Sequence, residues 1–190
     1  TRDRMPAFFG ITKILKVEVM HRVTDYYGPI VYSHFADLEA RYMPDTQKEV
    51  YNAFFCELDT AVAVLSDYIV EHPGASEFAR FDMLLDGDYD SWIKFANSLR
   101  MRLAMRIAVA RPEKAKTEFR KAMDNEYGVI READESVAVS TASGYTNPLG
   151  EINLVWNEAY MGAPMESILN GYEDPRREIY FATCQNEQFA

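Results

Sequence analysis

Hydrophobic residues recur along most of this chain at spacings of three and four, which is the period of a helix that buries one face. The first such stripe consists of Phe8, Ile11, Ile14, Leu15, Val19 and Val23. Turn-forming residues at 28–29 and 72–74 interrupt the pattern. The pattern predicts helices at 5–23, 46–71, 90–110 and 112–124. We therefore expect a mainly α fold in which the helices pair as hairpins.

The second predicted helix has both a start signal and an apolar face. Asp45 or Thr46 is suited to its N-cap, and Thr46 with Glu49 fits a capping box, in which each side chain bonds to the other residue's backbone. Its apolar face consists of Val50, Phe54, Leu58, Ala61 and Leu65. Cys56 lies inside this helical pattern and is predicted to be a buried free thiol.

Asp86, Asp88 and Asp90 alternate just before the third predicted helix, as oxygen ligands do at the start of a calcium-binding loop. The EF-hand pattern would then need Gly at position 91 and Glu at position 97, where this sequence has Ser91 and Asn97. Asp90 is therefore predicted to be the N-cap of the helix, where its carboxylate meets the positive end of the helix dipole.

The third predicted helix has two apolar stripes and three arginines. The first stripe consists of Trp92, Phe95, Ala96, Leu99, Leu103 and Ile107, and the second of Met101, Ala104, Met105 and Ala108. A helix with two apolar faces is packed between neighbours, so Leu99 and Leu103 are predicted to be buried. Arg100, Arg102 and Arg106 are then expected to pair with carboxylates, because buried guanidinium groups need such partners.

The chain changes character after residue 124. Residues 125–163 are rich in Gly, Pro, Ser, Thr and Asn and lose the helical period, which predicts a long irregular segment with a short strand at 137–139. A further helix is predicted after Pro164, ending at Gly171, since glycine is favoured where helices end.

Charge and composition exclude several classes of function. The formal net charge of −10 argues against binding to nucleic acid, which depends on neutralising phosphates with Lys and Arg. His21, His34 and His72 are scattered without a partner at ligand spacing, so neither a metal site nor a cofactor is predicted. The sequence contains no run of about 18 apolar residues, so no membrane span is predicted. The first residues do not fit a signal peptide, and we expect the chain to belong to a longer precursor whose targeting segment lies outside it.

Five stretches of the chain share their residues and their order with one known family. They are VTDYYGPIVYSHF (23–35), QKEVYNAFFCELDTAVAVL (47–65), GDYDSWIKFANSLRMRLAMRIA (87–108), NPL (147–149) and GYEDPRREIYF (171–181). Together they resemble the SusD/RagB-type nutrient-binding lipoproteins, and the third stretch is the most specific of the five.

The resemblance implies that residues 1–190 are part of a single SusD-like domain, an α-α superhelix of tetratricopeptide-like hairpins. In this interpretation residues 1–124 form helical hairpins, 125–163 an irregular loop segment, and 164–190 a helix and the following chain. The spacing of Ala115, Phe119 and Ala122 is also that of the second helix of a tetratricopeptide repeat. The family implies a lipid-anchored protein on the outer face of the outer membrane, with the lipidated cysteine outside this chain. It also implies a SusC-like TonB-dependent transporter as partner.

The preferred interpretation is a non-enzymatic protein that binds an extracellular nutrient, with an oligosaccharide favoured over a peptide as the ligand. Trp156 and Tyr160, with Tyr145, are predicted to stack on sugar rings, while Asn147 and Asn157 bond to hydroxyl groups. These rings could instead anchor the irregular segment to the core. The aromatic residues that bind starch in the founding member match no motif here, so no binding residue follows from the family. The alternative functions are a helical-repeat adaptor for a protein or peptide and an α-helical glycoside hydrolase.

Overall fold

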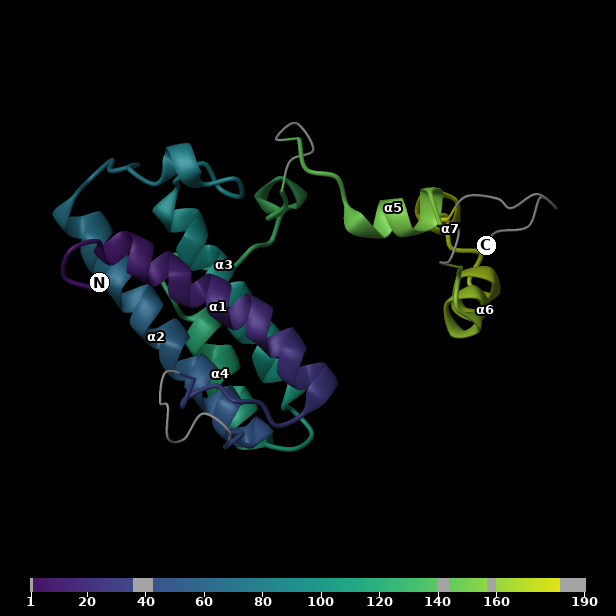
Figure 1. Cartoon of the computed structure of the whole chain (residues 1–190), viewed down its shortest axis with the longest axis horizontal. Coiled ribbons are helices and arrows are strands. Elements are labelled where there is room, and N and C mark those ends of the chain that lie inside the picture. The colour runs from purple at the N-terminus through teal and green to yellow at the C-terminus, as the bar shows by residue number, and fades with distance from the viewer. Residues whose placement is uncertain (1, 36–42, 140–143, 157–159, 182–190) are drawn as a thin grey trace. The chain divides into compact units, whose positions relative to one another are not determined.

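The computed structural model describes residues 2–35, 43–139, 144–156 and 160–181. The chain divides into two units, Thr1–Val139 and Ser140–Ala190. The first unit contains α1 (Pro6–Tyr27), α2 (Gln47–Glu71), the 3-10 helix η1 (Ala79–Phe81), α3 (Tyr89–Arg106), α4 (Pro112–Met123) and the 3-10 helix η2 (Ala133–Glu135), as Figure 1 shows. No strand occurs among the described residues, so the prediction of a mainly α fold is confirmed.

Helices α1 to α4 form two antiparallel hairpins. Contacts between α1 and α2 run in reversed sequence order: Tyr51 Oη donates to Asp25 Oδ1 at 2.7 Å, and Lys16 Nζ donates to Glu57 Oε1 at 2.9 Å. Helix α2 also packs on α3, and α3 packs on α4. The capping box predicted for Thr46 forms at the start of α2.

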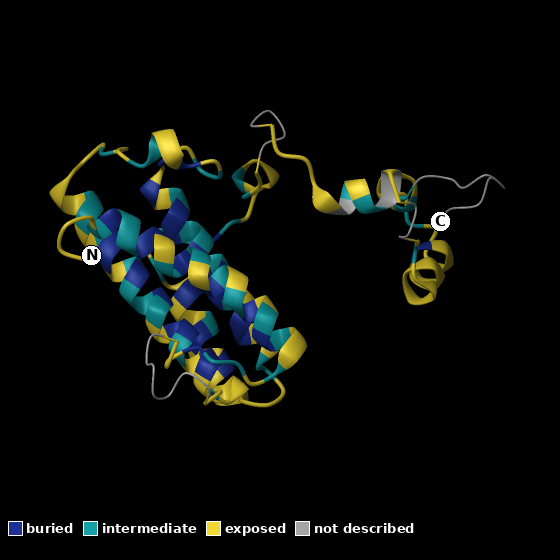
Figure 2. Cartoon of the chain, in the orientation of Figure 1, coloured by how far each residue is buried: buried dark blue, intermediate teal, exposed yellow. Residues whose placement is uncertain are grey.

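The core lies between α1, α2 and α3, where Figure 2 shows the buried residues. Leu99 is 3% exposed and Leu103 is fully buried, so the prediction for both residues is confirmed. The five apolar residues predicted to face the core from α2 are all buried as well. Helices α1 and α2 approach closely at Gly10, where an added Cβ would lie 2.9 Å from Leu65 Cγ.

Helix α1 is longer than predicted, and its buried face overlaps the predicted stripe only in part: Ile11 and Ile14 are buried as expected. It ends at Tyr27 instead of residue 23, because helical bonding continues until the Gly28 N–H donates to Thr24 O at 2.8 Å. Val19 of the expected stripe is exposed, whereas the polar residues His21 and Thr24 are buried. A search for apolar periodicity misses such positions, since a polar side chain tolerates burial when it finds a hydrogen-bond partner. Both residues find a carbonyl oxygen close by in the chain.

Helix α3 ends four residues before its predicted end. Backbone bonds from Ile107 N to Ala104 O and from Ala108 N to Met105 O, each 3.2 Å long, close tighter turns of the 3-10 type after Arg106. The predicted second apolar stripe is buried only in part, because Ala104 is buried and Met105 is 63% exposed.

A buried carboxylate that the sequence analysis missed organises the loop before α3. Asp82 accepts hydrogen bonds from Trp92 Nε1 at 2.7 Å and from Gly87 N at 2.9 Å. Gly87 has a φ of +78°, and a Cβ there would lie 2.6 Å from Ala79 N, so this turn requires glycine. The tight turn sets the point at which α3 can begin.

The predicted N-cap of α3 is wrong by two residues. Asp88 is the N-cap, and its Oδ1 accepts hydrogen bonds from Asp90 N at 3.1 Å and Ser91 N at 3.4 Å. Asp90 lies in the first turn of the helix instead. The turn at Gly87 places Asp88 at the helix end, which the alternation of aspartates could not show.

Arg100 is buried where α2, α3 and α4 meet. It pairs with the buried Glu118 of α4, and its Nη2 lies 2.6 Å from Asp59 Oδ1 of α2. Two lysines extend the network. Lys121 Nζ lies 2.5 Å from Asp59 Oδ1, and Lys114 Nζ lies 2.8 Å from Glu118 Oε1. Burial would raise the pKa of Asp59, but its contacts with Lys121 and Arg100 outweigh burial and hold that pKa below its ordinary value.

The other two arginines of α3 differ from each other. Arg106 Nε lies 2.6 Å from Asp25 Oδ2, so the predicted pairing with a carboxylate is confirmed for Arg100 and Arg106. No described carboxylate lies within ion-pairing distance of Arg102, which is exposed, so the expected pairing is wrong there.

Two further sequence predictions are wrong. Cys56 is exposed, because the buried face of α2 passes through Phe55 and Leu58 and leaves residue 56 facing solvent. The strand predicted at 137–139 does not form, and the described part of the chain offers these residues no strand as a partner.

The described residues of the second unit form short helices: α5 (Pro148–Leu154), α6 (Ala163–Gly171) and α7 (Arg177–Tyr180). Helix α6 confirms the helix predicted after Pro164. Helix α5 lies inside the segment that was predicted to be irregular, so that prediction is wrong for its residues. The helix was missed because seven residues are too few to show a helical period. Most of the described side chains of this unit are exposed, with Leu169 as a buried exception.

Replacing Leu103 with alanine is expected to lower the free energy of unfolding by about 2–5 kcal/mol, because the change leaves a cavity in a fully buried site. Met105→Ala is the matched control, since it truncates an exposed apolar side chain on the same helix and should cost within about 0.5 kcal/mol. Chemical denaturation of both variants measures the difference. Equal costs would show that α3 does not bury the Leu103 face.

Replacing Arg100 with methionine is expected to cost about 3 kcal/mol of unfolding free energy, because Glu118 stays buried without its main cation. The loss should lie at the low end for a broken buried pair, since Lys114 still contacts Glu118. Arg102→Met, on the exposed side of the same helix, should be nearly neutral. The double variant Arg100→Met with Glu118→Leu should regain most of the loss, and a double variant no better than Arg100→Met would contradict this account.

Candidate functional site

The aromatic residues predicted to bind ligand lie in the second unit and are exposed. Tyr145, Trp156 and Tyr160 expose 63%, 61% and 63% of their surface. Asn147 is exposed as well, and Asn157 lies outside the described residues. Among the residues that the structure describes, no ring contact joins any two of the three aromatics. Their assembly into one site therefore stays a prediction.

Helix α5 separates Tyr145 from Trp156. The Asn147 carbonyl oxygen accepts hydrogen bonds from Gly150 N at 2.9 Å and from Glu151 N at 3.4 Å, so Asn147 begins the first turn of the helix. Tyr145 lies just before this turn, and Trp156 follows the last helical residues. A helix of seven residues is about 10 Å long.

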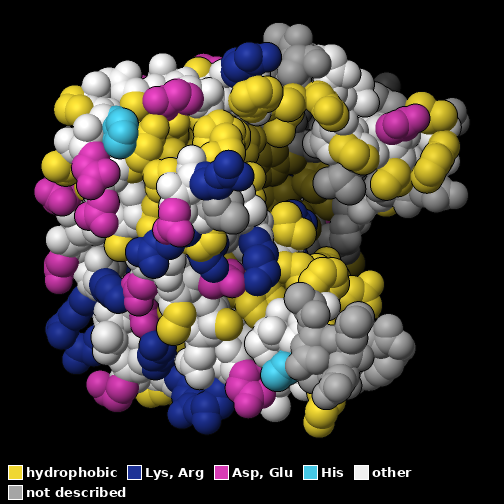
Figure 3. All heavy atoms as spheres, turned by 60° about the vertical axis from the view of Figure 1, so that its left-hand side comes forward, with side chains coloured by type: hydrophobic (Ala, Val, Ile, Leu, Met, Phe, Trp, Pro, Cys, Tyr) yellow, Lys and Arg dark blue, Asp and Glu magenta, His cyan; other side chains and the backbone are white. Residues whose placement is uncertain are grey.

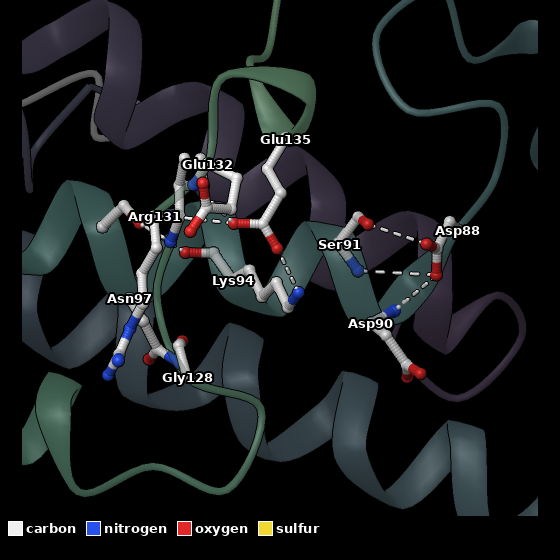
Figure 4. A network of polar contacts seen from close by, with 11 residues as sticks. Asp88, Asp90, Ser91, Lys94, Asn97, Gly128, Arg131, Glu132 and Glu135 are labelled. Atoms are coloured by element: carbon white, nitrogen blue, oxygen red, sulfur yellow. Dashed lines mark hydrogen bonds and ion pairs between the residues drawn. The ribbon is translucent and has the colours of Figure 1, made fainter.

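Residues 125–135 return along α3 and are held there by polar contacts, which Figure 4 shows. Asn97 Nδ2 donates to Gly128 O at 2.8 Å, and Lys94 Nζ donates to Glu135 Oε1 at 2.5 Å. The second oxygen of Glu135 accepts from the backbone N–H groups of Arg131 and Glu132. These bonds, led by the one from Lys94, lower the pKa of Glu135 to about 2.

A second polar cluster, which sequence reasoning missed, lies where α1 and α3 end. Asp25 accepts a hydrogen bond from Tyr51 Oη and pairs with Arg106. Burial, together with the hydrogen bond to Asp25, raises the pKa of Tyr51 to about 12. These residues come from three different helices, so no pattern along one helix could predict the cluster. The sequence indicated only that Arg106 would need a carboxylate partner.

The described residues offer no group of three or more His, Cys, Asp or Glu side chains that could hold a metal ion. No described helix is both long and apolar enough to cross a membrane. Figure 3 shows a face on which cationic and acidic side chains are interspersed, so the negative net charge is not gathered into one acidic patch there.

Comparison with known families matches the whole chain, residues 1–190, to the SusD-like family, described as Susd and RagB outer membrane lipoprotein. The chain belongs to the SusD-like family. The resemblance found in the sequence is confirmed, and so is the outer membrane assignment at the level of the family. A comparison with curated proteins found no match.

Solved structures support the SusD-like fold. A chitin-binding SusD homologue from Flavobacterium johnsoniae is 45% identical, with a TM-score of 0.90 over 98% of this chain and 38% of its own. A SusD homologue from Bacteroides vulgatus is 48% identical, with a TM-score of 0.87 over 94% of this chain and 35% of its own. A third structure, a chitin-binding protein, is 28% identical, with a TM-score of 0.73 over 92% and 36%. The SusD-like chain thus spans little more than a third of the length of these structures.

Replacing Glu135 with glutamine is expected to remove an acid-sensitive part of the stability. Because folding lowers the pKa of Glu135 to about 2, its carboxylate stabilises the fold above about pH 4.5, and this contribution is lost as the pH falls toward 2. The melting temperatures of the wild type and the variant should therefore differ most above about pH 5 and converge near pH 2. Asp134→Asn, at an exposed neighbour, should leave the profile unchanged, and a difference that is constant with pH would contradict the assignment.

Proposed function

We propose that this chain is part of a non-catalytic surface protein that binds extracellular oligosaccharide. Chitin-type oligomers of N-acetylglucosamine are the first candidate ligand. The observation that carries this proposal is the likeness to the chitin-binding homologue from Flavobacterium johnsoniae, at 45% identity over nearly the whole chain. Two proteins this similar keep the same backbone, so a difference in ligand would come from individual side chains.

The exposed rings of the second unit suit such a ligand. A pyranose ring has an apolar face that stacks on an aromatic ring, and its acetamide group exchanges hydrogen bonds with side-chain amides. Trp156 and Tyr160, with Tyr145, supply the rings, and Asn147 and Asn157 supply the amides. More than half of each ring faces solvent, and this exposure favours a stacking role over a role as loop anchor.

The proposed partner is a SusC-like TonB-dependent transporter, to which the bound oligosaccharide would be delivered. The support is membership of the family of outer membrane lipoproteins. Affinity purification of the full-length protein from outer membranes should recover such a transporter in defined proportion. Recovery of the protein without any transporter would count against this partner.

Replacing Trp156 with alanine tests the ligand site. We expect binding of an N-acetylglucosamine tetramer to weaken by about tenfold or more, because an aromatic residue at the centre of a binding site carries a large share of the affinity. The melting temperature should stay unchanged, since the ring is exposed. Isothermal titration calorimetry on the full-length protein measures the affinity.

Tyr172→Ala is the matched control, because it removes another strongly exposed ring from the second unit. It should leave binding of the tetramer intact. Retained binding in Trp156→Ala together with a lower melting temperature would mean that Trp156 only packs. A wild-type protein that ignores the tetramer but binds another neutral oligosaccharide would refute the ligand class and keep the glycan-binding function.

A further inference from the structure

A hollow of about 850 Å³ opens in the first unit, lined by residues from the ends of α1 and α3 and the beginnings of α2 and α4. This volume lies within the range of small-molecule sites in proteins. The hollow is lined by residues of the first unit alone, so it is distinct from the aromatic residues around α5.

The lining of the hollow is cationic, although the chain as a whole is strongly acidic. Its charged side chains are Lys48, Arg106, Arg111, Lys114 and the single carboxylate of Asp25. Asp25 is already engaged, because one of its oxygens accepts from Tyr51 Oη and the other pairs with Arg106 Nε.

Two of the four cations form no ion pair with a described carboxylate. Lys114 pairs with Glu118 at 2.8 Å, but no described carboxylate lies within ion-pairing distance of Lys48 or Arg111. Both side chains are exposed. Two exposed cations without an ion-pair partner line the same hollow, and an anionic ligand is their natural complement.

Uncharged polar groups line the same space. Gln47 and Asn52 contribute amides, and Gln47 is held in place because its Nε2 donates to Thr24 O at 2.9 Å. Tyr51 and Phe55 contribute aromatic carbon beneath them. Amides beside aromatic carbon suit a ring that carries hydroxyl groups, while a lone inorganic anion would use only the cations.

We propose that this hollow binds an acidic sugar, a uronic acid unit of an anionic oligosaccharide. Lys48 and Arg111 would hold its carboxylate, and Gln47 and Asn52 would bond to its hydroxyl groups. The inference rests on the proposed function only in taking the ligand to be a saccharide. The site is separate from the one predicted around Trp156, so each can fail alone.

The test compares trigalacturonate with its methyl ester, which keeps the rings and removes the charge. Calorimetry on the full-length protein should show the acid binding at least about tenfold more tightly than the ester, because a hydrogen bond to a charged group adds that much affinity. The preference should shrink as salt is added. In the double variant Lys48→Gln with Arg111→Gln it should disappear, while the melting temperature stays unchanged.

The matched control is Lys116→Gln with Arg120→Gln, which removes the same charge from exposed positions of α4 that do not line this hollow. This control should keep the preference for trigalacturonate over its methyl ester. If both double variants lost the preference equally, it would come from the net charge of the protein and not from the hollow. Equal affinity for acid and ester in the wild type would overturn the proposal. Trigalacturonate and triglutamate binding equally well would overturn the choice of a sugar. Trp156→Ala should keep trigalacturonate binding, which separates this site from the proposed chitin-type site.

Discussion

The buried guanidinium of Arg100 ties three helices of the first unit together. Here α2, α3 and α4 meet through charged groups, by way of Asp59 and Glu118. A buried arginine needs carboxylate partners at fixed positions, so these ion pairs are formed only when the three helices are in their native register. The apolar core beside it supplies the hydrophobic stabilisation, and the arginine network restricts how that core can be assembled.

Much of the fold could be predicted from the sequence, because it depends on local patterns. The apolar face of α2, the capping box at Thr46 and the burial of Leu99 and Leu103 follow from spacing along one helix. What could not be predicted depends on contacts that the pattern along a single helix does not show. The N-cap at Asp88 follows from a turn that Asp82 and Gly87 organise, and the close approach at Gly10 shows only against α2.

The candidate sites show the same limit. The rings of Tyr145, Trp156 and Tyr160 could be singled out because they occur in a segment of polar and small residues. The cationic hollow has no counterpart in the linear sequence, since Lys48 and Arg111 lie 63 positions apart and meet only because α2 and α4 begin at the same end of the unit. Membership of the SusD-like family adds a location at the outer membrane, which neither the sequence patterns nor the structure indicates.

The two tryptophans of the chain occupy opposite surroundings, one in each unit. Trp92 is fully buried, and its indole N–H donates to the carboxylate of Asp82, while Trp156 lies mostly in water. Their fluorescence therefore separates by wavelength, with short-wavelength emission from the buried indole and long-wavelength emission from the exposed one. The protein thus carries a built-in optical reporter for each unit. Loosening of the helical hairpins and events around α5 can be followed in one unlabelled sample.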